Sequence, residues 1–342
     1  MKYPTLALAC LLAVVAIPAA TAQINTDQMI KVGRNALYFK DYPLAIENFN
    51  QVIESKPYLA EPYLYRAVAK YSLDDLEGAA ADLTLCIERN PFIVQAYWYR
   101  AVCQQNLNHY QEAIDDYAKG LEFMPEDKQM LVNKTIAMAQ LEVTEKGDTI
   151  QAFANYAKAL ELDKNYAPIY GQRGMLYLQQ EDYAQALKDY DQAISLESDR
   201  PGYYVNRGLA RSHLNDLRGA MADYDKVIEL DSANQTARFN RALLRSRVGD
   251  TYGAIDDFKR VLEGEPDNFM AIYNLALLDK EAGRYHDAIR HLTQVIAEYP
   301  NFVPAYYLRA DLKRTLGDLK GYDKDYWQAY DLEQKLGKTS KQ

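Results

Sequence analysis

Residues that commonly carry catalysis are scarce in this chain of 342 residues. It has four histidines, and the closest two, His286 and His291, are five residues apart, whereas two metal ligands on one helix are usually four apart. The sequence has no glycine-rich phosphate loop and no nucleophile elbow. We therefore expect no catalytic residue, no metal site and no cofactor, and we predict that the chain is not an enzyme.

Long apolar runs are absent beyond the N-terminus. Residues 6–19 form an apolar run that follows Lys2 and precedes the small residues 20–22, which predicts a signal peptide at 1–22 with cleavage after Ala22. A spanning helix needs about 20 apolar residues, so a membrane anchor is the alternative, and lipid attachment at Cys10 is a second. We expect an exported chain without a membrane span after cleavage, in the periplasm or, alternatively, outside the cell.

Cysteine and positive charge are also sparse. Only Cys86 and Cys103 lie beyond the predicted signal peptide, and in an oxidising compartment they could pair. Their expected levels on neighbouring helices differ by about 7 Å, an offset that a disulfide tolerates poorly, so we expect two buried thiols with a disulfide as the alternative. The net charge is −9 and no basic stripe stands out, so we do not expect a nucleic-acid partner.

Alanine, in contrast, recurs at a fixed interval. The spacing is 34 residues, except for one interval of 39, in the series Ala45, Ala79, Ala113, Ala152, Ala186, Ala220, Ala254 and Ala288. A period in this range indicates repeats that each form one supersecondary unit and bury an apolar face only against the next unit.

Counting from nineteen residues before each alanine gives nine units. They are 26–59, 60–93, 94–127, 128–166, 167–200, 201–234, 235–268, 269–302 and 303–336, and a polar tail, 337–342, follows. Each unit contains two stretches with apolar residues at spacings of three and four, which predicts two helices. Proline follows the second stretch in five units, at Pro57, Pro91, Pro125, Pro266 and Pro300.

Small residues also recur within the first predicted helix. The eighth residue is glycine or alanine in all units but the fourth, which has Thr135. We expect the recurring alanine to face this position from the second helix, so that the two helices approach closely, and we expect most of the 29 tyrosines to pack beside them.

The pattern of a large residue, a small one four later, alanine twelve further on, an aromatic four beyond and then proline resembles the tetratricopeptide repeat (TPR). The resemblance implies an all-α fold, an α-α right-handed superhelix (TPR solenoid) of about nine helix hairpins. It also implies that the first helices line a concave groove, in which such proteins bind peptides or assemble complexes. The function expected from it is that of a scaffold for a protein or peptide partner.

Arginine and aspartate recur together. Six units have arginine at the seventh position and aspartate sixteen residues later, whereas the other three have Val32 and Asn48, Lys134 and Asn155, or Leu275 and His291. The two residues are thus present together or absent together. We expect them to form an ion pair between the two helices of these six units, because losing one partner would leave a buried charge unpaired, whereas losing both would not. The six pairs are Arg66–Asp82, Arg100–Asp116, Arg173–Asp189, Arg207–Asp223, Arg241–Asp257 and Arg309–Asp325.

Asparagine at the sixth position is the candidate binding feature. Asn133, Asn206, Asn240 and Asn274 stand there, and a row of amides at one level can hydrogen-bond an extended peptide backbone. These four residues resemble the asparagine ladder of the TPR superhelix in O-linked N-acetylglucosamine transferase. Aromatic residues at the fifth position are the candidate anchors; they are Trp98, Phe239, Tyr273 and Tyr307. Alternatively, the asparagines support contacts between units, and the aromatics pack between adjacent first helices.

Two units depart from the pattern. The fourth has five extra residues around 142–149, which we expect in the turn between its helices. The last has Tyr322 in place of the recurring alanine, with Trp327 and Tyr330 nearby and no following helix to cover it. The alternative function is therefore a structural protein that self-associates through its C-terminal unit.

Overall fold

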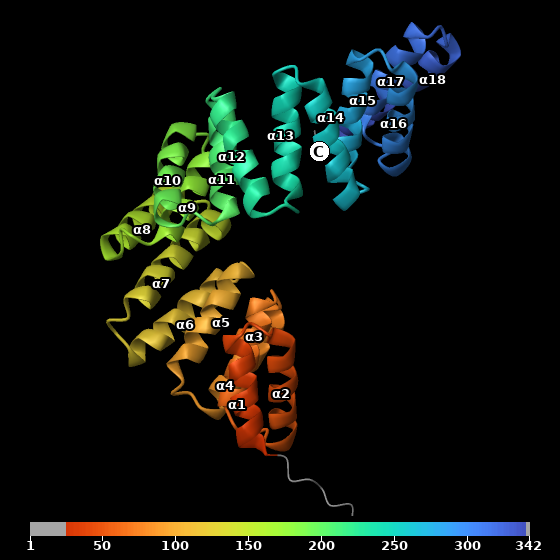
Figure 1. Ribbon diagram of the computed structural model, residues 1–342. Coiled ribbons are helices and arrows are strands. Elements are labelled where there is room, and N and C mark those ends of the chain that lie inside the picture. The colour runs from red at the N-terminus through yellow and green to blue at the C-terminus, as the bar shows by residue number, and fades with distance from the viewer. Residues whose placement is uncertain (1–24, 340–342) are drawn as a thin grey trace, which may run out of the picture. The chain divides into compact units, whose positions relative to one another are not determined.

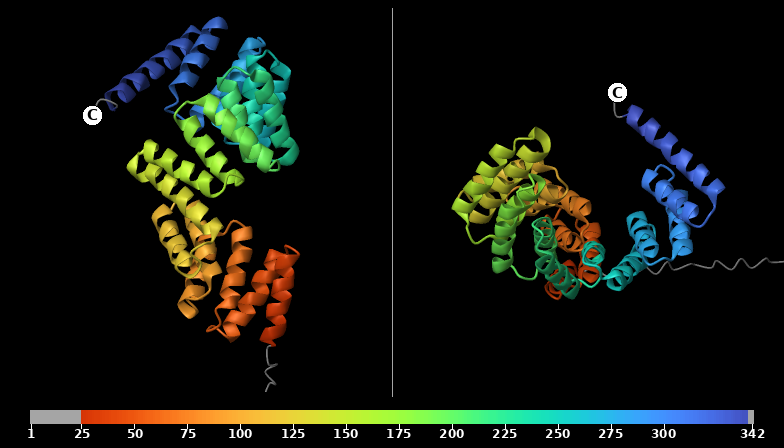
Figure 2. Two further views of the ribbon diagram at one scale, coloured as in Figure 1. Left: turned by 90° about the vertical axis from the view of Figure 1, so that its left-hand side faces the viewer. Right: turned by 90° about the horizontal axis from the view of Figure 1, so that it is seen from above.

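The computed structural model describes residues 25–339, with side chains to Lys335. These residues form α-helices in consecutive hairpins, so the predicted all-α solenoid is confirmed (Figures 1 and 2). The predicted signal peptide, residues 1–22, lies outside the described residues. No helix between residues 25 and 339 has both the length and the apolar character needed to cross a bilayer.

The chain divides into two compact units, residues 25–141 and 142–339. The first unit contains α1 (Thr26–Tyr38), α2 (Tyr42–Ser55), α3 (Glu61–Ser72), α4 (Leu76–Arg89), α5 (Val94–Asn106), α6 (Tyr110–Phe123) and α7 (Lys128–Leu141). The second begins with a short π-helix, η1 (Glu142–Lys146), and α8 (Thr149–Leu162). Five hairpins follow: α9 (Ala167–Gln179), α10 (Tyr183–Leu196), α11 (Pro201–His213), α12 (Leu217–Leu230), α13 (Gln235–Arg247), α14 (Thr251–Gly264), α15 (Phe269–Glu281), α16 (Tyr285–Glu298), α17 (Val303–Thr315) and α18 (Leu319–Thr339).

The short turn after each first helix has one recurring backbone conformation. A residue with positive φ ends each first helix, and it is Lys40, Asp74, Asn108, Gly147, Glu181, Asn215, Gly249, Gly283 or Gly317. In most of these turns an aspartate follows and accepts a hydrogen bond from the backbone three residues on, as Asp182 does from Gln185. The five prolines predicted to follow second helices each lie two residues beyond a helix end.

The recurring alanines are buried. All eight have no solvent-exposed area, which confirms them as core residues. In four hairpins the small residue of the first helix and the recurring alanine share one core cluster, whereas at the glycines an aromatic ring comes closest. A Cβ on Gly208 would meet the Tyr224 ring at 2.9 Å, and one on Gly33 would meet the Phe49 ring at 2.7 Å. The small residue therefore makes room for the aromatic ring four residues after the alanine.

The extra residues of the fourth unit are not all a turn, as the sequence analysis expected. Glu142–Lys146 form one turn of π-helix directly after α7 in the sequence, and none of them is buried. The backbone N–H of Asp148 then donates to the carbonyl of Glu142 at 2.9 Å. The insertion is thus accommodated by widening the helical winding, which π-helical turns commonly do.

All six predicted arginine–aspartate pairs form. In each, the guanidinium Nε and Nη2 donate to the two carboxylate oxygens at 2.5 to 3.1 Å. The carboxylates are buried, with Asp257 fully enclosed and Asp116 the most exposed at 6%. This forked geometry is the strong form of the interaction.

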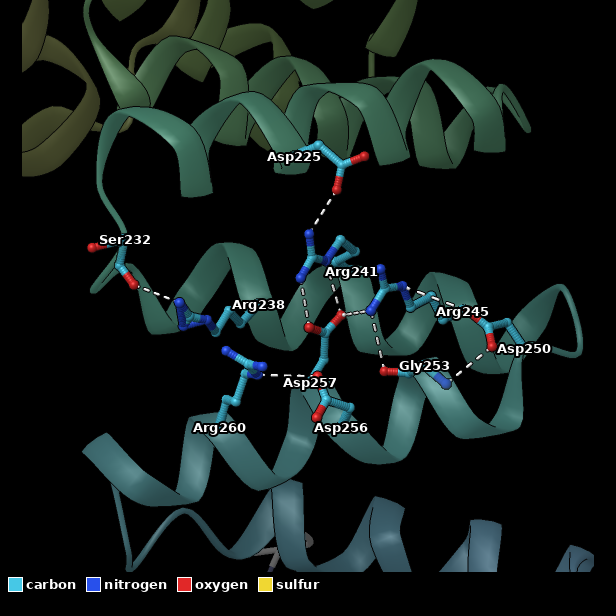
Figure 3. Close-up of polar contacts among 10 residues, drawn as sticks. All are labelled: Asp225, Ser232, Arg238, Arg241, Arg245, Asp250, Gly253, Asp256, Asp257 and Arg260. Atoms are coloured by element: carbon cyan, nitrogen blue, oxygen red, sulfur yellow. Dashed lines mark hydrogen bonds and ion pairs between the residues drawn. The ribbon is translucent and has the colours of Figure 1, made fainter.

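Five of these arginines also reach the preceding hairpin. The remaining nitrogen, Nη1, donates to a residue sixteen positions earlier, as Arg241 on α13 does to Asp225 on α12 at 2.7 Å (Figure 3). The other acceptors are Asn50, Thr84, Asp191 and Thr293. Arg173 is the exception, since Ala157 occupies that place. One guanidinium therefore joins three helices from two consecutive hairpins.

Asp116 and Asp325 differ in the direction of their pKa shift, and only Asp325 has a second cation beside it. Burial alone raises the pKa of Asp325, but hydrogen bonds from Arg309 and Lys313 outweigh it and lower that pKa. Asp116 has Arg100 alone, and burial raises its pKa. The place that corresponds to Lys313 is occupied by Gln104, whose Oε1 is buried without a hydrogen-bond partner.

The two cysteines are free thiols, as expected. Cys86 and Cys103 are fully buried in one apolar cluster of the first unit. Burial raises the pKa of each thiol to about 11, so both stay protonated at neutral pH.

We predict that Glu181→Gly stabilises the chain by about 1 kcal/mol, because a side chain at positive φ costs roughly that much. Urea unfolding measures the change. Glu181→Ala is the control and should give no gain, and Gly249→Ala should lower stability. Equal stability of the glycine and alanine variants at position 181 would show that this turn is unstrained.

We predict that Gln104→Lys gives Asp116 a second cation, lowers its pKa and adds about 1 kcal/mol of stability at neutral pH. The gain should fade as the pH falls through the folded-state pKa of Asp116, since protonation removes the attraction. Urea unfolding at several pH values and carboxyl NMR titration measure both effects. Lys70→Gln, beside Asp82, is the reverse control; a gain from Gln104→Lys that persists in strong acid contradicts the explanation.

Candidate functional site

Three of the predicted asparagines lie in consecutive hairpins of the second unit. Asn206 is on α11, Asn240 on α13 and Asn274 on α15, at the same place in each first helix, and all three are half-buried. Their shared register puts them on the same face of their helices. The row therefore offers amide groups that solvent or a ligand can still reach.

The three amides differ in what they contact. The Nδ2 of Asn274 donates to the Met270 carbonyl on its own helix at 2.7 Å, which leaves its oxygen as the acceptor. Asn206 lies near the Tyr190 hydroxyl, which is buried and lacks an aligned hydrogen bond. Burial raises the pKa of Tyr190, and Asn206 moderates that effect. Asn206 thus has a neighbour in the preceding hairpin, as the packing alternative expects, and Asn240 has no such contact within the described residues.

The candidate aromatic anchors of the second unit are engaged between helices. The Phe239 ring meets the Phe258 ring edge to face at 5.5 Å, and Tyr273 meets Phe302 at 5.2 Å. The Tyr307 hydroxyl donates to Glu333 at 2.9 Å. All three are half-buried, so a partner can contact part of each ring but cannot enclose it.

An aliphatic row beside the asparagines was not among the predicted site residues. Met175, Leu209 and Leu243 are the ninth residues of α9, α11 and α13, and they are 43%, 37% and 39% exposed. On a helix the ninth residue lies beside the sixth, so Leu209 adjoins Asn206 and Leu243 adjoins Asn240. Apolar residues at a position that points away from the hairpin partner, repeated at 34 residues, are the sequence signal that identifies them.

The remaining two predicted residues lie in the first unit. Asn133, on α7, is only 7% exposed, so its amide is less accessible than the other three. Trp98, on α5, is half-buried and lines a cavity of about 210 Å³ with Met124 and Met130. Its Nε1 is buried without a hydrogen-bond partner. These two residues therefore belong to the first unit and are not part of the row in the second unit.

Groups that could coordinate a metal do not gather within residues 25–339. No cluster of three or more histidine, cysteine, aspartate or glutamate side chains there has a geometry suited to an ion. The asparagine row and the aliphatic row present neutral amides and aliphatic side chains. These groups can form hydrogen bonds and apolar contacts.

Comparison with known families identifies part of the array. Residues 174–239 and 247–312 each match a family model described as tetratricopeptide repeat. These two segments are tetratricopeptide repeats. The first segment includes α11 with Asn206 and the second includes α15 with Asn274, whereas Asn240 on α13 lies between the two matches.

Solved structures show the same fold at low sequence identity. A structure titled as the functional characterization of Pseudomonas aeruginosa pilF has 19% identity and a TM-score of 0.55, over 64% of this chain and 97% of that one. A TPR protein from Parabacteroides merdae has 17% identity and a TM-score of 0.53, over 74% and 98%. PilW, a type IV pilus biogenesis factor, has 22% identity and a TM-score of 0.51, over 58% and 91%.

Proposed function

We propose that this chain is an exported, non-catalytic TPR scaffold that binds a protein or peptide partner along the first helices of its second unit. The observation that supports this proposal is that Asn206, Asn240 and Asn274 occupy the same position on three first helices, next to exposed aliphatic side chains. An extended segment has both backbone amides and side chains to match such a face. The amides would hold the partner's backbone, and the aliphatic row would cover its apolar side chains.

Export is proposed from the sequence alone. Residues 1–22 have the basic start, apolar run and small-residue end of a signal peptide, and the periplasm is the expected compartment. The buried thiols Cys86 and Cys103 are compatible with an oxidising compartment, because burial and protonation keep them unreactive.

We predict that changing Asn206, Asn240 and Asn274 together to alanine weakens partner capture about tenfold or more, since each lost hydrogen bond is worth about 1 kcal/mol. The measurement is a quantitative pull-down from envelope extract with residues 23–342 as bait.

The matched control changes two exposed amides on second helices, Gln192 and Gln294, to alanine. Urea unfolding of each bait separates a lost contact from lost stability, which matters because Asn206 neighbours Tyr190. Equal capture by the asparagine and control variants rules out the row as the binding site.

Self-association is the second candidate function, and the surface of α18 favours it. Trp327 is 58% exposed, Tyr330 41% and Tyr326 37%, and their rings contact one another. An exposed aromatic cluster of this kind is typical of a protein contact.

If α18 joins two copies, residues 23–342 will form a dimer whose fraction rises with concentration, and Trp327→Gln will weaken it about tenfold or more. Size-exclusion chromatography with light scattering over a wide concentration range measures this. The control is Tyr252→Gln, which alters an aromatic residue that is 85% exposed on α14. A monomer at all concentrations excludes the second candidate.

A further inference from the structure

One hairpin of the second unit has the charges of its neighbour reversed. In the hairpin of α13 and α14, Arg241 lies between Asp225 and Asp257, and Arg245 lies near Asp250 (Figure 3). One repeat later, 34 residues on, the corresponding residues are Lys259 for Asp225, Leu275 for Arg241, His291 for Asp257, Asp279 for Arg245 and Arg284 for Asp250. Lys259 and His291 thus stand where the preceding repeat has the acids Asp225 and Asp257. The guanidinium between those acids is replaced by the leucine side chain of Leu275.

A cavity lies where that guanidinium would be. It has a volume of about 320 Å³ and is lined by Lys259 of α14, Leu275 of α15 and His291 of α16, the three residues that replace the bridged trio. Arg284 and Arg290 also line it. Two acids, Asp279 and Asp287, line it as well, so the charge of the cavity depends on how these acids are paired.

The buried acid of this hairpin is already neutralised. Asp279 is 6% exposed, and the Nε of Arg284 donates to its Oδ1 at 2.9 Å. The Nδ1 of His291 lies 3.0 Å from its other oxygen, a contact that is favourable only when Nδ1 carries a proton. Arg284 therefore neutralises Asp279, and this acid does not compensate the other cations.

The remaining charges leave the cavity positive. Arg290 pairs with Asp287 on its own helix at 2.9 Å, and both are largely exposed to water. Lys259 makes no ion pair within the described part of the chain. One cation thus stands unpaired beside an open cavity, in the place where the preceding hairpin has an acid paired to arginine.

We propose that this cavity binds a phosphate group. An oxyanion there completes the reversed network, lying between Lys259 and His291 as the Arg241 guanidinium lies between Asp225 and Asp257. Ile255 and Leu275, with the exposed ring of Tyr252 at the mouth, supply apolar lining for an organic group attached to the phosphate. None of the asparagine-row residues lines the cavity, so this site is additional to the proposed peptide-binding face.

An NMR titration of the chain tests the proposal. Inorganic phosphate and phenyl phosphate are added in separate titrations at constant ionic strength, and the Leu275 methyl and His291 ring signals are followed. We expect saturable shifts of both signals. Tighter binding of phenyl phosphate assigns the site to a phosphomonoester, and equal binding assigns it to free phosphate.

Two neighbouring lysine and arginine residues give a matched pair of variants. Lys259→Gln should weaken phosphate binding about fivefold, the upper end for an exposed ion pair. Arg260→Gln removes the same charge one residue further along α14, where Arg260 pairs with Asp256 and does not line the cavity, so binding should be unchanged. Shifts that do not saturate, or equal weakening by both variants, overturn the proposal.

Discussion

The buried aspartate carboxylate on six of the second helices is the constraint on which the array depends. Six hairpins enclose an aspartate that is at most 6% exposed, and a buried carboxylate without a partner costs several kcal/mol. The arginine opposite it meets both oxygens and, in five cases, reaches the hairpin before. One side chain therefore fixes the spacing within a hairpin and the contact between two hairpins. This network and the small-residue contacts use the inward faces of the helices, and on α11 and α13 the sixth and ninth residues remain partly exposed.

The same constraint explains why the hairpin of α15 and α16 differs so completely. Replacing Arg241 by leucine, the residue at its counterpart Leu275, would remove the forked partner of Asp257 and leave this buried acid with Arg245 alone. The chain instead carries histidine at the acid's place and moves the acid to Asp279, where Arg284 and His291 meet it. The reversal preserves neutrality of the buried charges but leaves the centre of the network empty, and a cavity results.

The sequence predicted the parts of the fold that recur in residue type. The alanine period identified the repeats, and the joint presence of Arg173 and Asp189, or the joint absence at Val32 and Asn48, predicted the ion pairs. It did not predict the bridges between hairpins, because their acceptors vary among Asn50, Thr84, Asp191, Asp225 and Thr293 and no single residue type marks the place. Glycine marks the positive φ only in some turns, so the same conformation at Lys40 or Glu181 was not evident. In the candidate site, the asparagine row was proposed from the sequence, whereas Leu209 and Leu243 were not among the predicted residues.

A double-mutant cycle on Arg173 and Asp189 tests the central role of the buried pair most directly. This pair is the best isolated of the six, because Ala157 leaves Arg173 without a bridge and Tyr177 stands where other hairpins have a second cation. Urea unfolding should show that Arg173→Met and Asp189→Leu each cost about 3 kcal/mol, and that the double variant costs at least 1 kcal/mol less than their sum. If the two costs simply add, the buried ion pair is not the interaction that holds the hairpins together.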